Sequence, residues 1–360
     1  MKSYRIPMVP GPVKLPQAVI DVLSVNYGSA DLESEFFELY HETAANLKKI
    51  MATANTVVIL SGEGMAALWG AMKSCIVPGD RVLAVATGLF GRGIAEMARS
   101  IGADVRKVSL PDDQTVSDAA AIEEAIDSFE PKMITAVHCE TPSGTLNPLV
   151  DIGRLKETYR VPLLYVDAVS SIGGAPVMTD EWNIDLCLGG AQKCLSAPPD
   201  TAFLAVSQAA WKIVERVDYV GYDALKPFKN VTRRHYFPYT PNWHGLAALN
   251  AGAELVLSEG LPACFERHAS VASLCRRRLL EMGMTLFPAP GAVPSPTVTA
   301  AYLPDGVSWE GFDARLRGDG LVVGGGYEAL AGKIFRLGHM GSQANADLVV
   351  KALNVIQKSL

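Results

Sequence analysis

Short apolar strands alternate with helical segments over residues 16–206 of this chain. β-Branched and apolar runs typical of buried strands occur at 56–60, 81–85, 133–137, 163–166, 186–188 and 203–206. Apolar residues recur at helical spacing at 16–24, 33–51, 65–73, 93–101 and 152–159. Strands that alternate with helices form mostly parallel sheets covered by helices on both faces. The chain is therefore predicted to be an α/β protein whose ligands bind beyond the carboxyl ends of the strands.

The pattern changes near residue 260. A helical stretch at 246–257 ends before Glu259-Gly260-Leu261-Pro262. Beyond it, the residue pattern predicts a helix at 263–282, strands near 297–303 and 321–323, and a final helix at 345–356. A chain of 360 residues is long enough for two domains. We therefore expect an N-terminal extension (1–15), a large domain (16–259) and a small α+β C-terminal domain (260–360).

Composition narrows the classes of function. Hydrophobic residues make up 49% of the chain and charged residues 19%, which is ample for a buried core. The net charge is -6 and the longest basic cluster is Arg276-Arg277-Arg278, so a nucleic-acid partner is not expected. The N-terminus lacks the apolar region of a signal peptide, and no apolar run approaches the ~18 residues of a membrane span. Six scattered cysteines without CxxC spacing indicate reduced thiols and a cytoplasmic location.

Asp167 and Lys193 each follow an apolar strand. Asp167 ends the run at 163–166, and Lys193 comes 26 residues later, after Gly189-Gly190-Ala191-Gln192. Taken alone, Asp167 could be a turn residue and Lys193 a surface lysine. A lysine in a partly buried turn, however, has a lowered pKa and attacks carbonyl carbons as an amine. The pair suits pyridoxal chemistry, in which Lys193 forms a Schiff base and Asp167 pairs with the pyridinium nitrogen.

The segment Ser61-Gly62-Glu63-Gly64-Met65 marks a strand-to-helix turn. Such a turn presents backbone N–H groups and the positive end of a helix to an anion. The segment also fits G-x-G-x-x-A, a weak dinucleotide fingerprint, with Asp80 about twenty residues further on. Because Asp80 precedes the next strand and does not end it, an NAD-dependent oxidoreductase remains only a remote alternative.

Three further residues are candidates for binding. Phe90 is expected on a flexible loop at a strand end, where its ring would either fill the core or stack on a flat cofactor. Thr141 follows the strand at 133–137, and its hydroxyl could anchor a cofactor or belong to an ordinary turn. Arg336 lies in an apolar, strand-like run, which favours a bidentate contact with a substrate carboxylate.

Together, these blocks resemble the class V, fold-type I aminotransferases, specifically the alanine–glyoxylate and serine–pyruvate group. The likeness covers nearly the whole chain and rests on the spacing of several blocks. These blocks are Pro10-Gly11-Pro12, Val166-Asp167-Ala168-Val169-Ser170-Ser171, Gln192-Lys193-Cys194-Leu195-Ser196-Ala197-Pro198-Pro199 and Arg336-Leu337-Gly338. The resemblance implies transfer of an amino group between a small, alanine-like amino acid and pyruvate or glyoxylate, with pyridoxal 5'-phosphate as cofactor.

The resemblance also implies a role for each candidate residue. Lys193 matches the Schiff-base lysine and Asp167 the partner of the pyridine nitrogen. Phe90 matches the stacking aromatic residue, and Arg336 the arginine that binds the substrate carboxylate. The remaining cofactor contacts implied by the family are Glu63, Gly64, Met65, Thr141, Gln192, Phe237 and Thr240. The contact at Thr240 comes from the partner subunit in this family, which implies a homodimer with shared active sites.

Two positions depart from the typical members. Glu63 stands where they have a small hydroxyl residue in the phosphate cradle, and Phe237 where many have a tyrosine. A carboxylate ~4 Å from a phosphate is repelled by about 4 kcal/mol per unit charge at an effective dielectric constant of ~20. The pyridoxamine–pyruvate aminotransferase branch is similar at both positions, so an enzyme acting on unphosphorylated pyridoxamine is the alternative. A cysteine desulfurase is not expected, because the last cysteine, Cys275, lies in a predicted helix.

Overall fold

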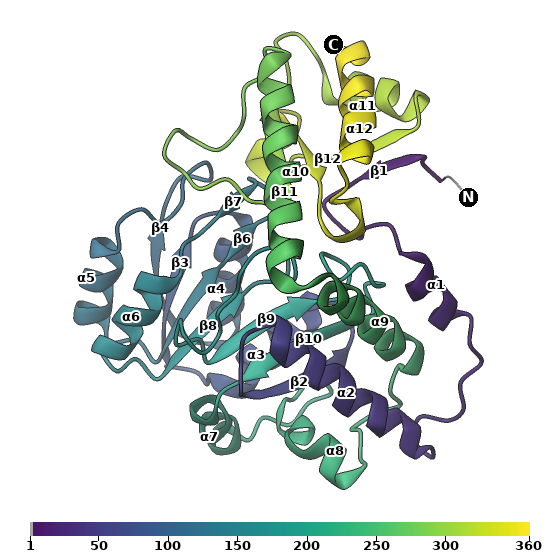
Figure 1. The fold of residues 1–360 in the computed structure, drawn as a ribbon. Coiled ribbons are helices and arrows are strands. Elements are labelled where there is room, and N and C mark those ends of the chain that lie inside the picture. The colour runs from purple at the N-terminus through teal and green to yellow at the C-terminus, as the bar shows by residue number, and fades with distance from the viewer. Residues whose placement is uncertain (1–2) are drawn as a thin grey trace.

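The computed structural model describes residues 3–360, which form two main sheets with their helices (Figure 1). The larger sheet has seven strands in the order β2-β10-β9-β8-β5-β3-β4. Its strands are β2 (Thr56–Ser61), β3 (Arg81–Ala86), β4 (Asp104–Ser109), β5 (Met133–Val137), β8 (Leu163–Asp167), β9 (Leu186–Gly190) and β10 (Thr201–Val206). Only β10 runs opposite to the other strands: it pairs antiparallel with β2 and β9, whereas β4, β3, β5, β8 and β9 pair in parallel. The mostly parallel α/β sheet expected from the sequence is thereby confirmed.

Burial along the strands explains their sequences. Every residue of β5, β8 and β9 is buried, as expected of central parallel strands with both faces covered. The edge strand β4 instead exposes Asp104, Arg106 and Lys107. Charges on an edge strand discourage pairing with other chains, and they also hide the strand from a search for apolar runs.

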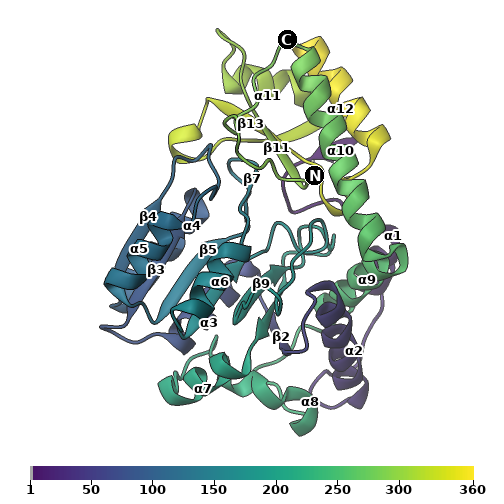
Figure 2. The same ribbon diagram turned by 60° about the vertical axis from the view of Figure 1, so that its left-hand side comes forward.

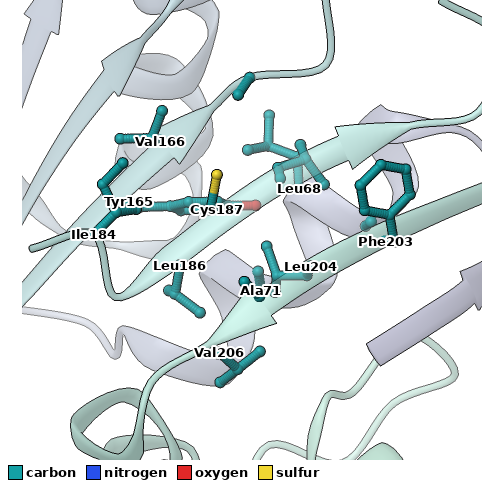
Figure 3. Close-up of a cluster of buried hydrophobic side chains, with 14 of the residues drawn as sticks. Leu68, Ala71, Tyr165, Val166, Ile184, Leu186, Cys187, Phe203, Leu204 and Val206 are labelled. Atoms are coloured by element: carbon teal, nitrogen blue, oxygen red, sulfur yellow. The ribbon is translucent and has the colours of Figure 1, made fainter. Parts of the chain in front are cut away.

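Helices cover both faces of the large sheet. The helices of this part of the chain are α1 (Gln17–Leu23), α2 (Ser34–Ile50), α3 (Gly64–Cys75), α4 (Leu89–Ile101), α5 (Ala120–Phe129), α6 (Val150–Thr158), α7 (Gln208–Val217), α8 (Val231–Arg234) and α9 (Trp243–Glu259), of which α1 and α8 pack on other helices. Figure 3 shows part of the core, where Leu68 and Ala71 of α3 lie among side chains of β8, β9 and β10. This packing fixes the strand ends that carry the candidate site residues.

The second sheet has four strands in the order β1-β12-β13-β11. They are β1 (Ile6–Met8), β11 (Val298–Tyr302), β12 (Leu321–Gly325) and β13 (Ile334–Gly338), with helices α10 (Leu261–Glu281), α11 (Trp309–Gly318) and α12 (Ala346–Ser359). The long helix α10 rises from α9 along this sheet (Figure 2). Because β1 pairs with β12, part of the predicted N-terminal extension belongs to this sheet. The domain boundaries themselves remain a prediction.

The structure corrects the expected position of Phe90. It lies in the first turn of α4, which begins at Leu89, and not on a flexible loop. Gly91 and Gly93 give this turn a loop-like sequence. A Cβ atom on Gly91 would lie 2.9 Å from Cα of Ala86, so the glycine allows the helix to pack closely on β3. Among residues 3–360, no helix is both long and apolar enough to cross a membrane.

Candidate active site

Lys193 lies in the turn that follows β9, in contact with the N-terminal segment at Pro10 and Gly11. Its Nζ donates a hydrogen bond to the carbonyl oxygen of Pro10. Gly11 has a φ of 87°, and a Cβ atom there would lie 2.8 Å from Nζ, so only glycine lets the segment pass this closely. Burial lowers the pKa of Lys193, an effect that Cys139 opposes and Arg336 reinforces. A lowered pKa increases the fraction of neutral amine, the form that attacks a carbonyl carbon.

Asp167 ends β8 and is 8% exposed. Its Oδ1 accepts a hydrogen bond of 2.9 Å from the backbone N–H of Val169. Burial raises the pKa of Asp167 to about 6; the hydrogen bond and Lys193 oppose this shift, and Glu63 adds to it. The structure therefore places a buried carboxyl group within electrostatic reach of both Lys193 and Glu63.

Arg336 projects from β13 and is only 3% exposed. Its Nε donates to the carbonyl oxygen of Gly325 at 2.8 Å, and one Nη donates to that of Thr141 at 3.3 Å. The ring of Tyr327 lies 4.4 Å from the guanidinium carbon. Within residues 3–360, no carboxylate forms an ion pair with Arg336. A buried charge without a partner is costly, so this guanidinium is suited to an anion that comes from outside the chain.

Glu63 is the N-cap of α3, and its side chain turns back onto the helix. Its Oε1 accepts a hydrogen bond of 2.9 Å from the backbone N–H of Met65. Gly64 packs against Val169, with a hypothetical Cβ atom 3.0 Å from Cγ2 of the valine. The carboxylate thus occupies one of the backbone N–H groups that a helix start otherwise presents to an anionic ligand.

Gln192 and Thr141 are both buried: Gln192 beside Lys193, and Thr141 in contact with Arg336. Gln192 directly precedes Lys193, and its Oε1 has no hydrogen-bond partner among the described residues. The hydroxyl of Thr141 bonds to that of Ser170. An unpaired, buried amide oxygen is a group that a bound ligand can satisfy.

Glu140, which the sequence analysis did not single out, is fully buried beside Thr141. Its Oε1 accepts from the N–H of Gly91 at 2.8 Å, and its Oε2 from the N–H of Phe90 at 3.1 Å. Burial raises the pKa of Glu140 to about 7. Its sequence context, Cys139-Glu140-Thr141, carries no catalytic motif, so only the structure reveals its link to Phe90.

Phe237 and Thr240 lie in a different setting. Phe237 packs edge-on against the rings of Phe36, Phe228 and Tyr239, with centroids 5.0–5.9 Å apart. The hydroxyl of Tyr239 accepts from the N–H of Ser61 at 3.1 Å, which brings this segment to the end of β2. Thr240 is exposed. The structure thus gathers Lys193, Asp167, Arg336, Glu63, Thr141 and Gln192, and leaves Thr240 on the surface of the chain.

The alternative dinucleotide site finds no support in the position of Asp80. This residue lies in the turn before β3, where its carboxylate pairs with Lys132 at 2.6 Å and accepts from the N–H of Val77. The carboxylate of Asp80 is therefore already engaged in an ion pair, and it lies at the N-terminal end of β3. A ribose-binding acid is expected at the opposite, carboxyl end of the strand.

Comparison with known proteins decides between these readings. The family model for class-V aminotransferases matches residues 10–338. This chain is a class-V aminotransferase. It therefore catalyses transamination between an amino acid and an oxo acid, and enzymes of this class and fold use pyridoxal 5'-phosphate.

Similar proteins share the fold over almost their whole length. The pyridoxamine–pyruvate transaminase of Mesorhizobium japonicum is 31% identical, over 91% of this chain and 84% of that enzyme. The alanine–glyoxylate aminotransferase of Oryctolagus cuniculus is 29% identical, over 99% of this chain and 93% of that enzyme. The crystal structure of an alanine–glyoxylate aminotransferase from Nostoc sp. superposes with a TM-score of 0.94, covering 100% of this chain and 96% of that one, at 28% identity.

The residues at the strand ends fit the family's cofactor. Asp167 offers a buried carboxyl group for the pyridine nitrogen, and Lys193 offers a buried amine for the aldehyde. Oε1 of Gln192, beside Lys193, has no hydrogen-bond partner among the described residues and is open to a contact from the cofactor. Only the turn at Glu63 departs from this fit, because its carboxylate caps the helix start itself.

Proposed function

We propose that this enzyme transfers an amino group between a small, alanine-like amino acid and pyruvate or glyoxylate, with Lys193 as the covalent attachment point of the cofactor. One observation carries the proposal: the buried amine of Lys193 lies within electrostatic reach of Asp167 and of Arg336, and Arg336 has no carboxylate partner among residues 3–360. The activities of similar enzymes, alanine–glyoxylate and pyridoxamine–pyruvate transamination, support the choice of small substrates.

The roles of the central residues follow from their surroundings. When bound, pyridoxal phosphate supplies an electron-withdrawing ring that weakens a bond at the substrate's α-carbon. Asp167 holds negative charge where the ring nitrogen needs it, and burial strengthens that interaction. Lys193 holds and moves a proton at Nζ, since burial lowers its pKa and so makes that proton easier to release. Arg336 orients the substrate by its carboxylate.

Further residues are assigned to binding of the cofactor. We assign Phe90 to stacking on its ring, and Thr141 and Gln192 to its phosphate end. We assign the turn Glu63-Gly64-Met65 to the same end. These assignments rest on the family resemblance.

A homodimer with shared active sites is part of the proposal. Thr240 is exposed, and its segment is tied to the end of β2 through Tyr239 and Ser61. An exposed hydroxyl at that position suits a contact made with the partner's cofactor, with Phe237 anchoring the segment in the aromatic cluster. The six free thiols support a cytoplasmic location.

Chemical trapping tests the assignment of Lys193. Borohydride reduction of the enzyme incubated with pyridoxal phosphate, followed by peptide mapping, is expected to place the pyridoxyl group on Lys193. Lys193→Ala should lose both the label and transaminase activity, while Lys351→Ala on α12 should lose neither. A label on another lysine in the wild type contradicts the proposal.

A second candidate activity rests on Glu63. Its carboxylate already accepts the N–H of Met65, so an incoming phosphate dianion meets a like charge at an occupied helix start. The alternative is therefore that the enzyme accepts unphosphorylated pyridoxamine and transaminates it with pyruvate. The 31% identity to a pyridoxamine–pyruvate transaminase supports this reading.

Equilibrium binding of pyridoxal and pyridoxal phosphate tests the second candidate. Wild type is expected to bind pyridoxal at least as well as its phosphate ester. Glu63→Gly frees the N–H of Met65 and removes the charge, so it should shift the preference toward the phosphate ester at least tenfold, or ~1.4 kcal/mol. Glu33→Gly, at the exposed N-cap of α2, controls for the loss of a carboxylate. Tight binding of the phosphate ester by wild type, unchanged in Glu63→Gly, would return the enzyme to the ordinary alanine–glyoxylate type.

A further inference from the structure

Glu140 is a buried carboxylate whose hydrogen bonds go to the first turn of another element. It belongs to the two-residue strand β6 (Cys139–Glu140), yet both of its carboxylate oxygens accept backbone N–H groups of α4. One of these N–H groups is that of Phe90, at 3.1 Å, and the other is that of Gly91, at 2.8 Å. The carboxylate therefore fixes the backbone from which the ring of Phe90 projects.

The first turn of α4 is shaped around this carboxylate. A Cβ atom on Gly88 would lie 2.6 Å from Cδ of Glu140 and 2.8 Å from its Oε2. Gly88 has an extended backbone that any residue adopts, with a φ of 179°. Its lack of a side chain is thus explained by the space that Glu140 occupies and not by backbone strain.

Glu140 is also connected to the other side of the site. The next residue, Thr141, accepts a hydrogen bond from Arg336 through its carbonyl oxygen at 3.3 Å. Asp167 and Arg92 both influence the pKa of Glu140, so the carboxylate lies within electrostatic reach of Asp167. The dipeptide Glu140-Thr141 therefore contacts both the first turn of α4, which carries Phe90, and Arg336.

We infer that Glu140 is a positioning residue: it holds Phe90 in the orientation in which its ring stacks on the cofactor. This inference rests on the proposed function, in which Phe90 is the stacking residue. A carboxylate suits the task because it accepts two N–H groups at once, and charged acceptors hold such groups more strongly than neutral ones. In Glu140→Gln, the amide NH₂ faces one of the two N–H groups, so one hydrogen bond is lost and the turn shifts.

A double-mutant cycle tests whether Glu140 acts through Phe90. Pyridoxal phosphate is titrated into cofactor-free wild type, Glu140→Gln, Phe90→Leu and the double variant, with absorbance and the circular dichroism of the bound cofactor as readouts. Each single variant is expected to weaken binding about tenfold, and Glu140→Gln should reduce the cofactor's circular dichroism. The double variant should bind about as well as Phe90→Leu alone, because a misplaced ring and a missing ring cost the same contact.

If Glu140→Gln does not fold, a second variant tests the same inference. Gly88→Ala pushes the carboxylate away without changing any charge, and it should weaken cofactor binding in the same direction. Gly93→Ala, on the same helix and with open space around the added methyl group, is the matched control and should bind the cofactor like wild type. If Gly88→Ala binds pyridoxal phosphate with the same affinity as Gly93→Ala, the inference is overturned.

The remaining outcomes separate this inference from the proposed function. If wild type yields no reducible adduct on Lys193, both fail. If it does, and Glu140→Gln binds the cofactor like wild type, only the positioning role fails. Effects of the two substitutions that multiply in the double variant also overturn it, because Glu140 would then act on the cofactor independently of Phe90.

Discussion

Arg336 shows how far a single residue can be interpreted from its surroundings. A guanidinium that is 3% exposed and bonded to two backbone carbonyl groups remains positively charged, because an arginine does not lose its proton in proteins. The chain offers it no carboxylate among residues 3–360. The desolvation cost is offset when a substrate supplies the missing charge, which is why this position is favourable for recognition.

Replacement of Arg336 is expected to damage substrate binding specifically. Arg336→Ala should lower kcat/KM for alanine and for glyoxylate by an amount corresponding to about 2–5 kcal/mol, since a buried bidentate pair is lost. Arg336→Lys should recover only part of this, because an ammonium group cannot form the planar fork. The test is steady-state kinetics, with Arg277→Ala on the exposed face of α10 as control. Wild-type kcat/KM in Arg336→Ala would contradict the assignment.

Sequence patterns identified residues whose chemistry is local. Asp167 ends β8 and Lys193 lies in the turn after β9, so their place at the carboxyl edge of the sheet follows from the parallel topology alone. Glu140 was not predicted from the sequence because its proposed role depends on a contact with the N–H of Phe90, which lies 50 positions away in the chain. No spacing rule connects a carboxylate on one element with the first turn of another.

At the scale of elements, the strands were more predictable than the helix starts. Buried strands such as β5 and β8 consist of uninterrupted apolar runs, which the sequence displays openly. The start of α4 was placed too late because its first turn contains Gly91. The reason is tertiary: close approach to Ala86 and a carboxylate supplied by Glu140 replace the usual capping side chain.

Other elements were missed for different reasons. The edge strand β4 carries exposed charges and has no apolar run to detect. Helix α7, in contrast, follows Ser207, whose side chain accepts from the N–H of Ala210, and buries Trp211 and Val214. A serine cap followed by apolar residues at helical spacing is a recognisable start signal, so this helix could have been predicted from the sequence.

At the scale of the whole molecule, the turn η3 (Gly341–Gln343) joins the two sheets. The N–H of Gly341 donates to Nε2 of His268 on α10 at 3.0 Å, and the N–H of Ser342 donates to the hydroxyl of Ser196 at 2.9 Å. Ser196 follows the turn of Lys193, and η3 follows the strand of Arg336. The relative position of the covalent and the substrate-binding residue thus depends on contacts outside the active site.

His268 makes this junction sensitive to acid. Its Nδ1 donates to the carbonyl oxygen of Cys264 at 2.7 Å while Nε2 accepts from Gly341, an arrangement that only the neutral ring provides. Burial lowers the pKa of His268 to about 4, from an ordinary value of 6.5. Between these values the unfolded chain binds more protons than the folded one. The stabilising contribution is therefore complete above pH 6.5 and is lost as the pH falls toward about 4.

Urea unfolding of wild type and His268→Gln between pH 4.5 and 7.5 tests this dependence. Asp167 and Glu140, whose pKa values are raised to about 6 and about 7, act in the opposite sense in both proteins, so the difference between the curves isolates His268. We expect the variant to be less stable at pH 7.5, and the gap to narrow by up to about 1.4 kcal/mol per pH unit below the ordinary pKa of histidine. His41→Gln, at an exposed position, should follow wild type within about 0.5 kcal/mol. A gap that stays constant down to pH 4.5 would mean that protonation of His268 does not govern the junction between the sheets.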